Sequence, residues 1–484
     1  MVLALPGRSD EPALIRAEAE WGQTGIGLLV SGRAAFAARA RAARLATQTL
    51  DLQYYIWRDD LTGNLLAREA LQAADRGVHV RLLLDDMYAI GRERLLSTLD
   101  AHRHIEVRLF NATHWRRFGQ LGFLLEMLFG GWHLNRRMHN KAWVADGRLA
   151  ILGGRNVGDE YFDASDTFNF RDLDLAVTGA AARDARSIFE AYWNHRLSRP
   201  VAEVSRAPHN RRGGLRKLSH RLDRATRLAK AEPFFAEILR GASTSSYYGK
   251  PARLVSAPAE DVRVIADPPD KAARKGSAAE WLVSDVVQLL KGAKKEALLI
   301  SPYFVPGEEG AALLEDLAAR GVHVSVVTNS LAATDVVAVH GGYARYRKRL
   351  LRAGVQLHEL RPSGGEGTSM LGSRGASLHT KALVVDGTRA FVGSFNLDPR
   401  SRALNTEMGT FVDDVVVAQG VSEEHARLAC PDRSWQVSID RAGSLRWATM
   451  IDGAQAACRT EPDASGARRA LAWLARHAPV ESQL

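Results

Sequence analysis

The chain has 484 residues, of which 46% are hydrophobic and 25% are charged. These values are ordinary for a globular protein, and the length allows two domains with substantial cores. The two cysteines, Cys430 and Cys458, lack metal-ligand spacing, so we expect reduced thiols, although one disulfide is neither required nor excluded. A net charge of +10 predicts attraction to polyanions, either an anionic bilayer or nucleic acid.

The N-terminal residues 1–6 lack the basic start and apolar stretch of a signal peptide, so we expect no signal peptide. No run of about 18 apolar residues occurs anywhere, and we therefore expect no transmembrane helix. Any contact with a membrane is then expected to be peripheral.

The first half of the chain begins with a helix pattern at residues 64–75, followed by Gly77 and an apolar strand at 78–84. The second half repeats this order at 311–319 and 322–327. Alternation of helix and apolar strand predicts an α/β fold with a largely parallel sheet flanked by helices.

The string Arg-Gly-Val-His-Val occurs at residues 76–80 and again at 320–324, which is a sign of internal duplication. Its histidines, His79 and His323, are interpreted as structural and not catalytic.

The segment from Trp115 to Trp132 carries apolar and aromatic residues between arginine pairs. It is too short to span a bilayer, but its composition suits insertion into the membrane interface. The alternative is a helix buried in the core, because short apolar runs are ambiguous.

Residues 206–230 are strongly basic, with nine lysines and arginines against Asp223 alone. The pattern predicts a loop around Gly213 and Gly214 followed by a basic helix, and it marks a linker between two domains. A solvated helix face and a surface that binds polyanions are both compatible with this charge.

One motif recurs in both halves with every internal spacing conserved. The first copy has His139, Lys141, Asp146, Gly153 and Asn156, and the second has His379, Lys381, Asp386, Gly393 and Asn396 at a constant offset of 240 (379 − 139 = 240). A single His-x-Lys is common by chance and most often an ordinary strand start, but two matched copies indicate two fused copies of one domain. We expect one site built across a pseudo-two-fold axis.

These residue types suit the cleavage of a phosphodiester. Histidine serves as nucleophile or as proton shuttle because its free pKa lies near neutrality. Lysine and asparagine side chains stabilise charge on the phosphate oxygens, so no metal or other cofactor is expected. In each copy, His and Lys are two residues apart on a predicted strand and point to the same face. Asp146 and Asp386 precede glycine at a predicted turn, which favours a structural role for them.

The doubled motif resembles the signature of the phospholipase D superfamily, and segments 50–57, 136–141, 153–159, 328–333, 394–401 and 404–409 resemble bacterial cardiolipin synthases of the C type. The resemblance extends from about Gly25 to the region of Trp435. It implies two fused phospholipase D-like domains, at 22–204 and 253–484 with a C-terminal extension, joined by a basic linker at 205–252. Each domain would hold a mixed, largely parallel sheet flanked by helices.

The resemblance also implies roles for the site residues. His139 and His379 would share the nucleophile and proton-shuttle roles, with His139 as nucleophile, while Lys141, Lys381, Asn156 and Asn396 bind the phosphate. The family uses a carboxylate to fix the tautomer of each histidine. By position in the sequence, Glu407 matches His379 and Asp172 matches His139, with Asp174 as the alternative. Gly154 replaces the serine found at Ser394, which makes the two copies unequal.

Three functions remain open at this point. The first is a phosphatidyl transferase that makes cardiolipin from phosphatidylglycerol and a donor, either phosphatidylethanolamine or a second phosphatidylglycerol. The second is a hydrolase of phospholipids or, less favoured, of nucleic acid, and the third is an inactive membrane-binding scaffold. We expect peripheral binding to an anionic inner membrane on its cytoplasmic face, no obligate nucleic-acid partner, and a site that one monomer completes. Intact His, Lys and Asn residues in both copies argue against the scaffold.

Overall fold

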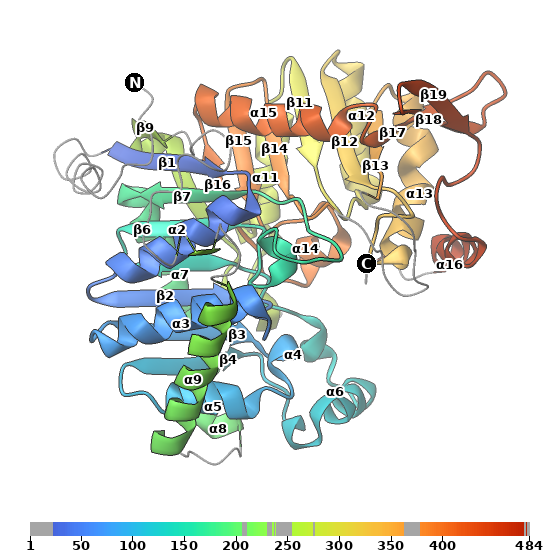
Figure 1. The fold of residues 1–484 in the computed structure, drawn as a ribbon. Coiled ribbons are helices and arrows are strands. Elements are labelled where there is room, and N and C mark those ends of the chain that lie inside the picture. The colour runs from blue at the N-terminus through green and yellow to red at the C-terminus, as the bar shows by residue number, and fades with distance from the viewer. Residues whose placement is uncertain are drawn as a thin grey trace. The chain divides into compact units, whose positions relative to one another are not determined.

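The computed structural model describes residues 23–205, 211–229, 235–236, 238, 254–273, 276–362, 378–478 and 481. The fold consists of two compact units (Figure 1). Unit 1 comprises Met1–Ala164, Asp174–Leu282 and Leu404–Thr410, and unit 2 comprises Ser165–Leu173, Val283–Ala403 and Phe411–Leu484. Each unit thus includes a short segment from the other half of the sequence.

Unit 1 is built on a nine-stranded sheet with the order β8-β4-β3-β2-β5-β6-β7-β1-β9. The strands are β1 (Gln23–Leu29), β2 (Thr49–Tyr54), β3 (His79–Asp85), β4 (Ile105–Phe110), β5 (Ala142–Ala145), β6 (Leu149–Gly153), β7 (Asp174–Thr178), β8 (Ser198–Pro200) and β9 (Leu254–Pro258). The helices include α2 (Gly32–Leu45), α3 (Leu61–Asp75), α4 (Asp86–Ala89), α5 (Glu93–Asp100), α6 (Gly119–Leu128), α7 (Gly179–Trp193), α8 (Val201–Val204) and α9 (Arg211–Ala229).

Unit 2 contains a sheet with the order β15-β14-β11-β12-β13-β17-β18-β19. These strands are β11 (Glu296–Ile300), β12 (His323–Asn329), β13 (Gln356–Leu360), β14 (Ala382–Val385), β15 (Arg389–Gly393), β17 (Ser434–Ile439), β18 (Leu445–Ile451) and β19 (Ala454–Cys458). Its helices are α11 (Leu282–Lys291), α12 (Gly307–Ala319), α13 (Val337–Arg352), α14 (Pro399–Ala403), α15 (Val415–Ala429) and α16 (Gly466–His477). Strand β10 (Val262–Ala266) neighbours β16 (Met408–Val412). The order β13-β12-β11-β14-β15 repeats the order β4-β3-β2-β5-β6 of unit 1, as the duplicated sequence predicts.

The expected α/β fold with a duplicated sheet order is confirmed, but the sheets are less parallel than expected. Among the described strands, β2, β3 and β4 run parallel to one another in unit 1, and β11, β12 and β13 do so in unit 2. Antiparallel pairings join β2 to β5 and β5 to β6 in unit 1, and β11 to β14 and β14 to β15 in unit 2. Helical crossovers join β2 to β3, β3 to β4, β11 to β12 and β12 to β13, whereas tight turns join β5 to β6 and β14 to β15.

Those tight turns form at Asp-Gly in both units. Asp146 and Asp386 each have φ of 54°, and Gly147 and Gly387 have φ of 65° and 66°, so both central residues of each turn have the positive φ that a type I′ turn requires. The Asp146 carboxylate accepts hydrogen bonds from the backbone N–H groups of residues 47–49, at 2.8–2.9 Å. The Asp386 carboxylate accepts equivalent bonds from residues 294–296, at 2.7–3.1 Å. These contacts support a structural role for both aspartates.

Helix α3 shows how the predicted elements form. Asp60 caps its N-terminus by accepting a hydrogen bond from Gly63 N at 2.9 Å, and the chain turns at Gly77 with φ of 97° before entering β3. The buried core of unit 1 beside this sheet includes Leu83, Phe110, Met138, Phe189, Tyr192, Trp193 and Ala272. In unit 2 a smaller cluster joins Leu331 and Val337 to Ala472 of the C-terminal helix α16.

The basic segment is helical from Arg211, so the loop predicted around Gly213 and Gly214 is wrong. Helix α9 buries Leu218 and Leu222 and contacts α3 and α5. This packing against unit 1 continues the helix through both glycines. Residues 206–210, 230–234, 237 and 239–252 of the expected linker lie outside the described residues.

Candidate active site

In unit 1, the motif histidine lies on a segment that Asp85 holds at the end of β3. Asp85 Oδ2 accepts a hydrogen bond from Met138 N at 2.8 Å, and Asp85 Oδ1 lies 3.0 Å from the Arg137 guanidinium. In unit 2, Asn329 at the end of β12 holds the corresponding segment. Its Oδ1 accepts a hydrogen bond from Leu378 N at 3.0 Å, and its Nδ2 donates one to Leu378 O at 3.1 Å. A polar side chain at the end of a parallel strand thus positions each motif.

The His139 imidazole is oriented by a carboxylate. Its Nδ1 lies 2.8 Å from Glu407 Oε2, and Glu407 is fully buried. The backbones also pair, because His139 N donates to Thr406 O at 2.9 Å and Thr406 N donates to Arg137 O at 2.9 Å. Glu407 N in turn donates to Asp267 Oδ2 at 2.9 Å. The carboxylate and the histidine are therefore fixed by both side-chain and backbone contacts.

The His379 imidazole has the equivalent arrangement in unit 2. Its Nδ1 lies 2.6 Å from Asp172 Oδ2, and Asp172 is 2% exposed. His379 N donates to Arg171 O at 2.7 Å, and Thr380 Oγ1 donates to the same oxygen at 3.0 Å. Both units thus present one histidine with its Nδ1 bound to a buried carboxylate.

The pairing of carboxylates with histidines expected from the sequence is wrong. Glu407 pairs with His139 and Asp172 pairs with His379, which is the opposite assignment. The physical reason is that residues 404–410 belong to unit 1 and residues 165–173 belong to unit 2. Each carboxylate therefore packs in the unit that is formed mainly by the other sequence repeat. The alternative residue Asp174 has another role, because it lies in the core 2.9 Å from Arg39 and 3.4 Å from Arg155.

Both motif lysines are buried beside the backbone of their histidines. Lys141 Nζ donates to His139 O, and Lys381 Nζ donates to His379 O. The ammonium of Lys141 lies 5.6 Å from the centre of the Tyr55 ring, and that ring packs edge-on against His139 at 5.2 Å. In unit 2, the Phe170 ring lies 5.0 Å from the His379 ring. A fixed positive charge and an aromatic wall therefore accompany the histidine in unit 1, and the same elements are present in unit 2.

The two asparagines are held differently. Asn156 Oδ1 accepts from Ile56 N at 3.1 Å, and Asn156 Nδ2 donates to the Tyr161 hydroxyl at 3.0 Å. Asn396 is 4% exposed, and its backbone N donates to Ser401 Oγ at 3.2 Å. Each asparagine follows the hairpin that ends at Gly153 or Gly393. The two motif copies therefore differ in the contacts of their asparagines as well as at Gly154 and Ser394.

This geometry can activate an imidazole for phosphoryl chemistry. A carboxylate that accepts the Nδ1 proton fixes one tautomer, so Nε2 carries the lone pair that attacks or exchanges a proton. The carboxylate also stabilises the charge that develops on the ring when Nε2 forms a bond.

Sequence reasoning had missed four contributors: Tyr55, Asp85, Phe170 and Asn329. Tyr55 and Asn329 lie within the segments that carry the resemblance, whereas Phe170 lies outside them. Asp85 and Asn329 occupy the last positions of the repeated strands β3 and β12. The duplicated pattern could have pointed to the last two residues, since both end an apolar strand with a polar side chain. Ring contacts have no comparable signal in one sequence.

Helix α6 exposes its apolar residues and buries its acidic one. Among its residues only Gly122 and Glu126 are buried, so the core alternative for this segment is wrong. In Figure 1, α6 lies at the edge of unit 1, apart from the sheet. The exposed apolar surface, here called the α6 surface, consists of Trp115, Phe118, Leu121, Leu124, Leu128 and Phe129. Their exposed fractions range from 39% for Trp115 to 76% for Phe129.

None of the helices in the described ranges is both long enough and apolar enough to cross a bilayer.

Unit 1 also contains an apolar pocket beside the first motif. It lies between the sheet and helices α3, α5 and α9, and Tyr55, which contacts His139, lines it. Other lining residues are Leu52, Leu82, Leu84, Tyr88, Leu99 and Leu218.

Comparison with known proteins gives consistent results. The family described as "Cardiolipin synthase, PLD-like domain" matches residues 40–193 and 286–429. The chain is 38% identical over 471 residues to "Cardiolipin synthase C" of Escherichia coli K12, which covers 95% of this chain and 96% of that protein. It is 27% identical to a "Cardiolipin synthase" of Halalkalibacterium halodurans, over 80% of this chain and 63% of that protein. Among solved structures, phosphatidylserine synthase of Haemophilus influenzae has a TM-score of 0.56 at 13% identity, over 86% of this chain and 91% of that one.

Proposed function

We propose that this chain, which belongs to the family of phospholipase D-like cardiolipin synthases, makes cardiolipin. In the proposed reaction it transfers a phosphatidyl group to phosphatidylglycerol. The observation that carries the proposal is the matched pair of imidazoles, each with Nδ1 on a buried carboxylate and a buried lysine two residues later. Two such groups suit a reaction in two displacements, in which one histidine bonds phosphorus and the other moves protons.

In the first displacement, His139 Nε2 attacks the phosphorus of the donor lipid, and the bond to the headgroup oxygen breaks. His379 gives a proton to the departing alkoxide. In the second displacement, His379 takes a proton from a hydroxyl of phosphatidylglycerol, whose oxygen attacks the phosphohistidine and releases His139. The net reaction exchanges one alcohol for another and consumes no oxidant or metal.

The lysines and asparagines are proposed to stabilise the phosphorane-like transition state. Lys141 and Lys381 are buried, so their charge acts in a medium that screens it less than water does. Because Lys141 also faces the Tyr55 ring, its ammonium is held in place beside His139.

We propose that the α6 surface inserts into the membrane interface, which brings the protein to its lipid substrates. An exposed patch of large apolar residues marks a contact surface, and interfacial helices of this kind bury their apolar face at the headgroup boundary. Helix α9 adds the exposed basic residues Arg216, Lys217, Arg221, Arg224 and Arg227, which favour an anionic bilayer. The apolar pocket that Tyr55 lines is proposed to take part of an acyl chain during the reaction.

Product analysis tests the proposal. Purified protein is incubated with vesicles of phosphatidylglycerol and phosphatidylethanolamine, and the lipids are identified by mass spectrometry. Cardiolipin that is absent with His139→Ala and His379→Ala supports transfer. Phosphatidic acid as the sole product would instead identify a hydrolase, and lack of turnover with intact vesicle binding would identify a scaffold. Parallel vesicles with isotope-labelled phosphatidylethanolamine identify the donor.

A further inference from the structure

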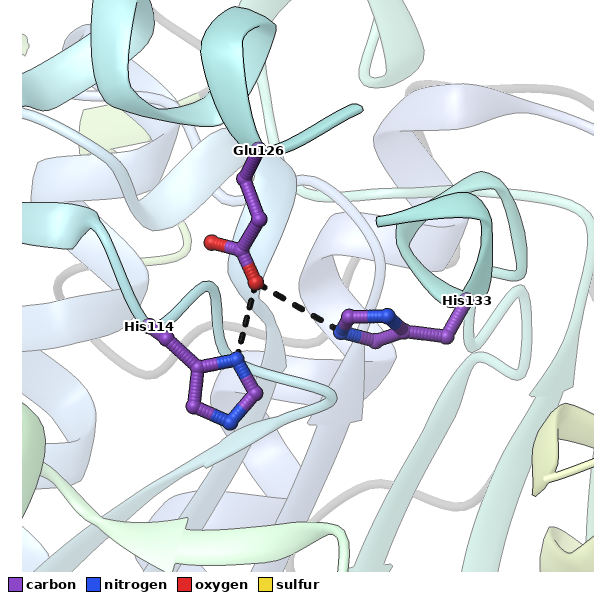
Figure 2. Close-up of side chains that lie close together, drawn as sticks. All are labelled: His114, Glu126 and His133. Atoms are coloured by element: carbon purple, nitrogen blue, oxygen red, sulfur yellow. Dashed lines mark hydrogen bonds and ion pairs between the residues drawn. The ribbon is translucent and has the colours of Figure 1, made fainter. Parts of the chain in front are cut away.

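The α6 segment contains a second group of converging polar side chains that the proposed reaction does not use. His114 lies just before the 3₁₀ turn η1 (Arg116–Phe118), Glu126 lies in α6, and His133 lies in the turn η2 (Trp132–Asn135). Figure 2 shows both imidazoles directed at the same carboxylate oxygen. Glu126 Oε1 lies 2.8 Å from His114 Nδ1 and 3.7 Å from His133 Nε2.

We propose that His114, Glu126 and His133 form a site for a divalent transition metal, of which Zn²⁺ fits the donors best. Two imidazole nitrogens and one carboxylate oxygen are a common zinc ligand set that leaves a fourth position for water. Ligand atoms about 2.1 Å from a tetrahedral zinc lie about 3.4 Å apart. The two distances to Glu126 Oε1 bracket this value, and all three ligand atoms lie within 4.8 Å of one another.

The rest of the Glu126 carboxylate is already fixed. Glu126 Oε2 accepts hydrogen bonds from Thr113 Oγ1 and from Trp115 N, the latter at 3.0 Å. The backbone near His133 is also held, because Asn111 Nδ2 donates to His133 O at 2.9 Å. Such contacts around the ligands orient them and strengthen metal binding. The site is open to solvent, since the side chains of His114 and His133 are 67% and 41% exposed.

A similar group in unit 2 shows why this one fits a metal ion. His340, Glu359 and Glu461 also converge, but the buried guanidinium of Arg347 lies among them, 3.1 Å from Glu359 and 2.7 Å from Glu461. The Arg347 guanidinium also lies 2.8 Å from His340 Nε2, so it fills the position of a cation. Within the described part of the chain, the ion pairs of Glu126 are formed with His114 and His133, and no lysine or arginine pairs with it.

The position of the site indicates its purpose. His114 and His133 lie on either side of α6 in the sequence and Glu126 lies within it, so one ion would tie the start, the middle and the end of this segment together. With two neutral imidazoles and one carboxylate, bound Zn²⁺ also leaves a charge of +1 beside the α6 surface. Zinc should therefore order this segment and strengthen its attraction to anionic lipid, a consequence that rests on the membrane contact proposed above.

The test measures metal on the full chain. Protein stripped with a chelator is dialysed against micromolar Zn²⁺, and bound metal is counted by mass spectrometry for the wild type, His114→Gln, His133→Gln and the control His79→Gln. His79 is exposed at the start of β3 and outside the group. We expect one tightly bound zinc in the wild type and the control, and affinity at least about 10-fold lower in both ligand variants. Visible absorption of bound Co²⁺ reports the tetrahedral geometry independently.

Hydrogen exchange provides the second readout. Zinc should increase protection of residues 113–135 in the wild type and leave it unchanged in His114→Gln, whose exposed side chain allows the variant to fold. Absence of stoichiometric binding in the wild type would overturn the site. Zinc that persists in both ligand variants but disappears in His139→Ala would also overturn it, because the metal would then sit at the active site. Chelation should leave turnover of a short-chain soluble substrate unchanged, so the metal site and the reaction can fail separately.

Discussion

The Nδ1 atom of His139 lies 2.8 Å from Glu407 Oε2, although 268 residues separate the two in the sequence. His379 forms the same contact with Asp172, which precedes it by 207 residues. Each unit of the fold therefore joins a histidine to a carboxylate from the other repeat. In the proposed reaction Glu407 serves the nucleophile, and Asp172 serves the proton shuttle.

Replacement of the two carboxylates should separate these roles. With phosphatidyl-p-nitrophenol, whose leaving group departs without a proton, Glu407→Gln should slow the first release of p-nitrophenolate by at least about 100-fold. The Asp172→Asn variant should release one equivalent of p-nitrophenolate at nearly the wild-type rate. Its turnover should then stop, because only the second displacement needs His379 as a base. Stopped-flow absorbance measures both phases. A slow first release in Asp172→Asn and a single rapid release in Glu407→Gln would instead support the pairing of each carboxylate with the histidine of its own repeat.

Tyr55 should act through its ring, which contacts both His139 and Lys141. Tyr55→Phe keeps the ring and should retain most activity. Tyr55→Ala should lower kcat by about 5–30-fold, the equivalent of a cation–π contact of about 1–2 kcal/mol. Steady-state kinetics that separate kcat from KM check this. A Tyr55→Ala enzyme with unchanged kcat would mean that the ring only lines the apolar pocket.

The turn aspartates should contribute to stability in a pH-dependent way. Burial alone raises the pKa of the Asp146 carboxyl, but hydrogen bonds from backbone N–H groups lower it, and the result is a pKa below its usual range. The same balance lowers the pKa of Asp386. A depressed pKa in the folded state contributes stability that is present above the unfolded pKa of about 3.9 and is lost as pH falls through the folded value.

Asp146→Asn and Asp386→Asn should therefore each lower the Tm at pH 7 by about 2–4 °C. The difference from the wild type should shrink as the pH falls below about 4. Thermal denaturation followed by circular dichroism measures this, with the exposed Asp166→Asn as control. A difference in Tm that is independent of pH would show that the carboxylate charge is not what the turn requires.

The α6 surface should provide binding that resists salt. Leu121→Ser, Leu124→Ser and Phe129→Ser together should abolish vesicle binding at high salt and leave turnover of a short-chain soluble substrate unchanged. Arg216→Gln, Lys217→Gln and Arg224→Gln should weaken binding only at low salt, by roughly 1 kcal/mol per charge. Vesicle sedimentation measures both effects. Full binding at high salt by the triple serine variant would exclude this surface as the membrane contact.

Much of the fold followed from the sequence because the duplicated patterns are local. The helix predicted at 64–75 corresponds to α3, and the strand predicted at 322–327 corresponds to β12, which begins one residue later, because apolar patterning and a nearby glycine determine each element locally. The sheet direction could not follow in the same way. The antiparallel pairing of β2 with β5 depends on the order of strands in the sheet, which spacing along the chain does not encode.

The pairing of carboxylates failed for a related reason. Glu407 and Asp172 were recognisable as acidic residues downstream of a motif, but sequence proximity favoured the histidine of the same repeat. Long-range backbone pairing determines which carboxylate reaches each histidine. It joins Met138 to Thr406 and Arg171 to Leu378. The α6 segment was ambiguous in the sequence because apolar residues lie on all its faces, and the burial of Gly122 and Glu126 shows which face turns inward.

In the proposed reaction, His139 carries the phosphatidyl group between the two displacements. The most direct measurement is to mix His379→Ala enzyme with phosphatidyl-p-nitrophenol, quench without acid, and map the modified peptide by mass spectrometry. We expect about one phosphatidyl group per chain, on the peptide that contains His139, because loss of His379 blocks the second displacement. A label on any other residue, or full turnover by the wild type with no trapped label in the variant, would contradict it.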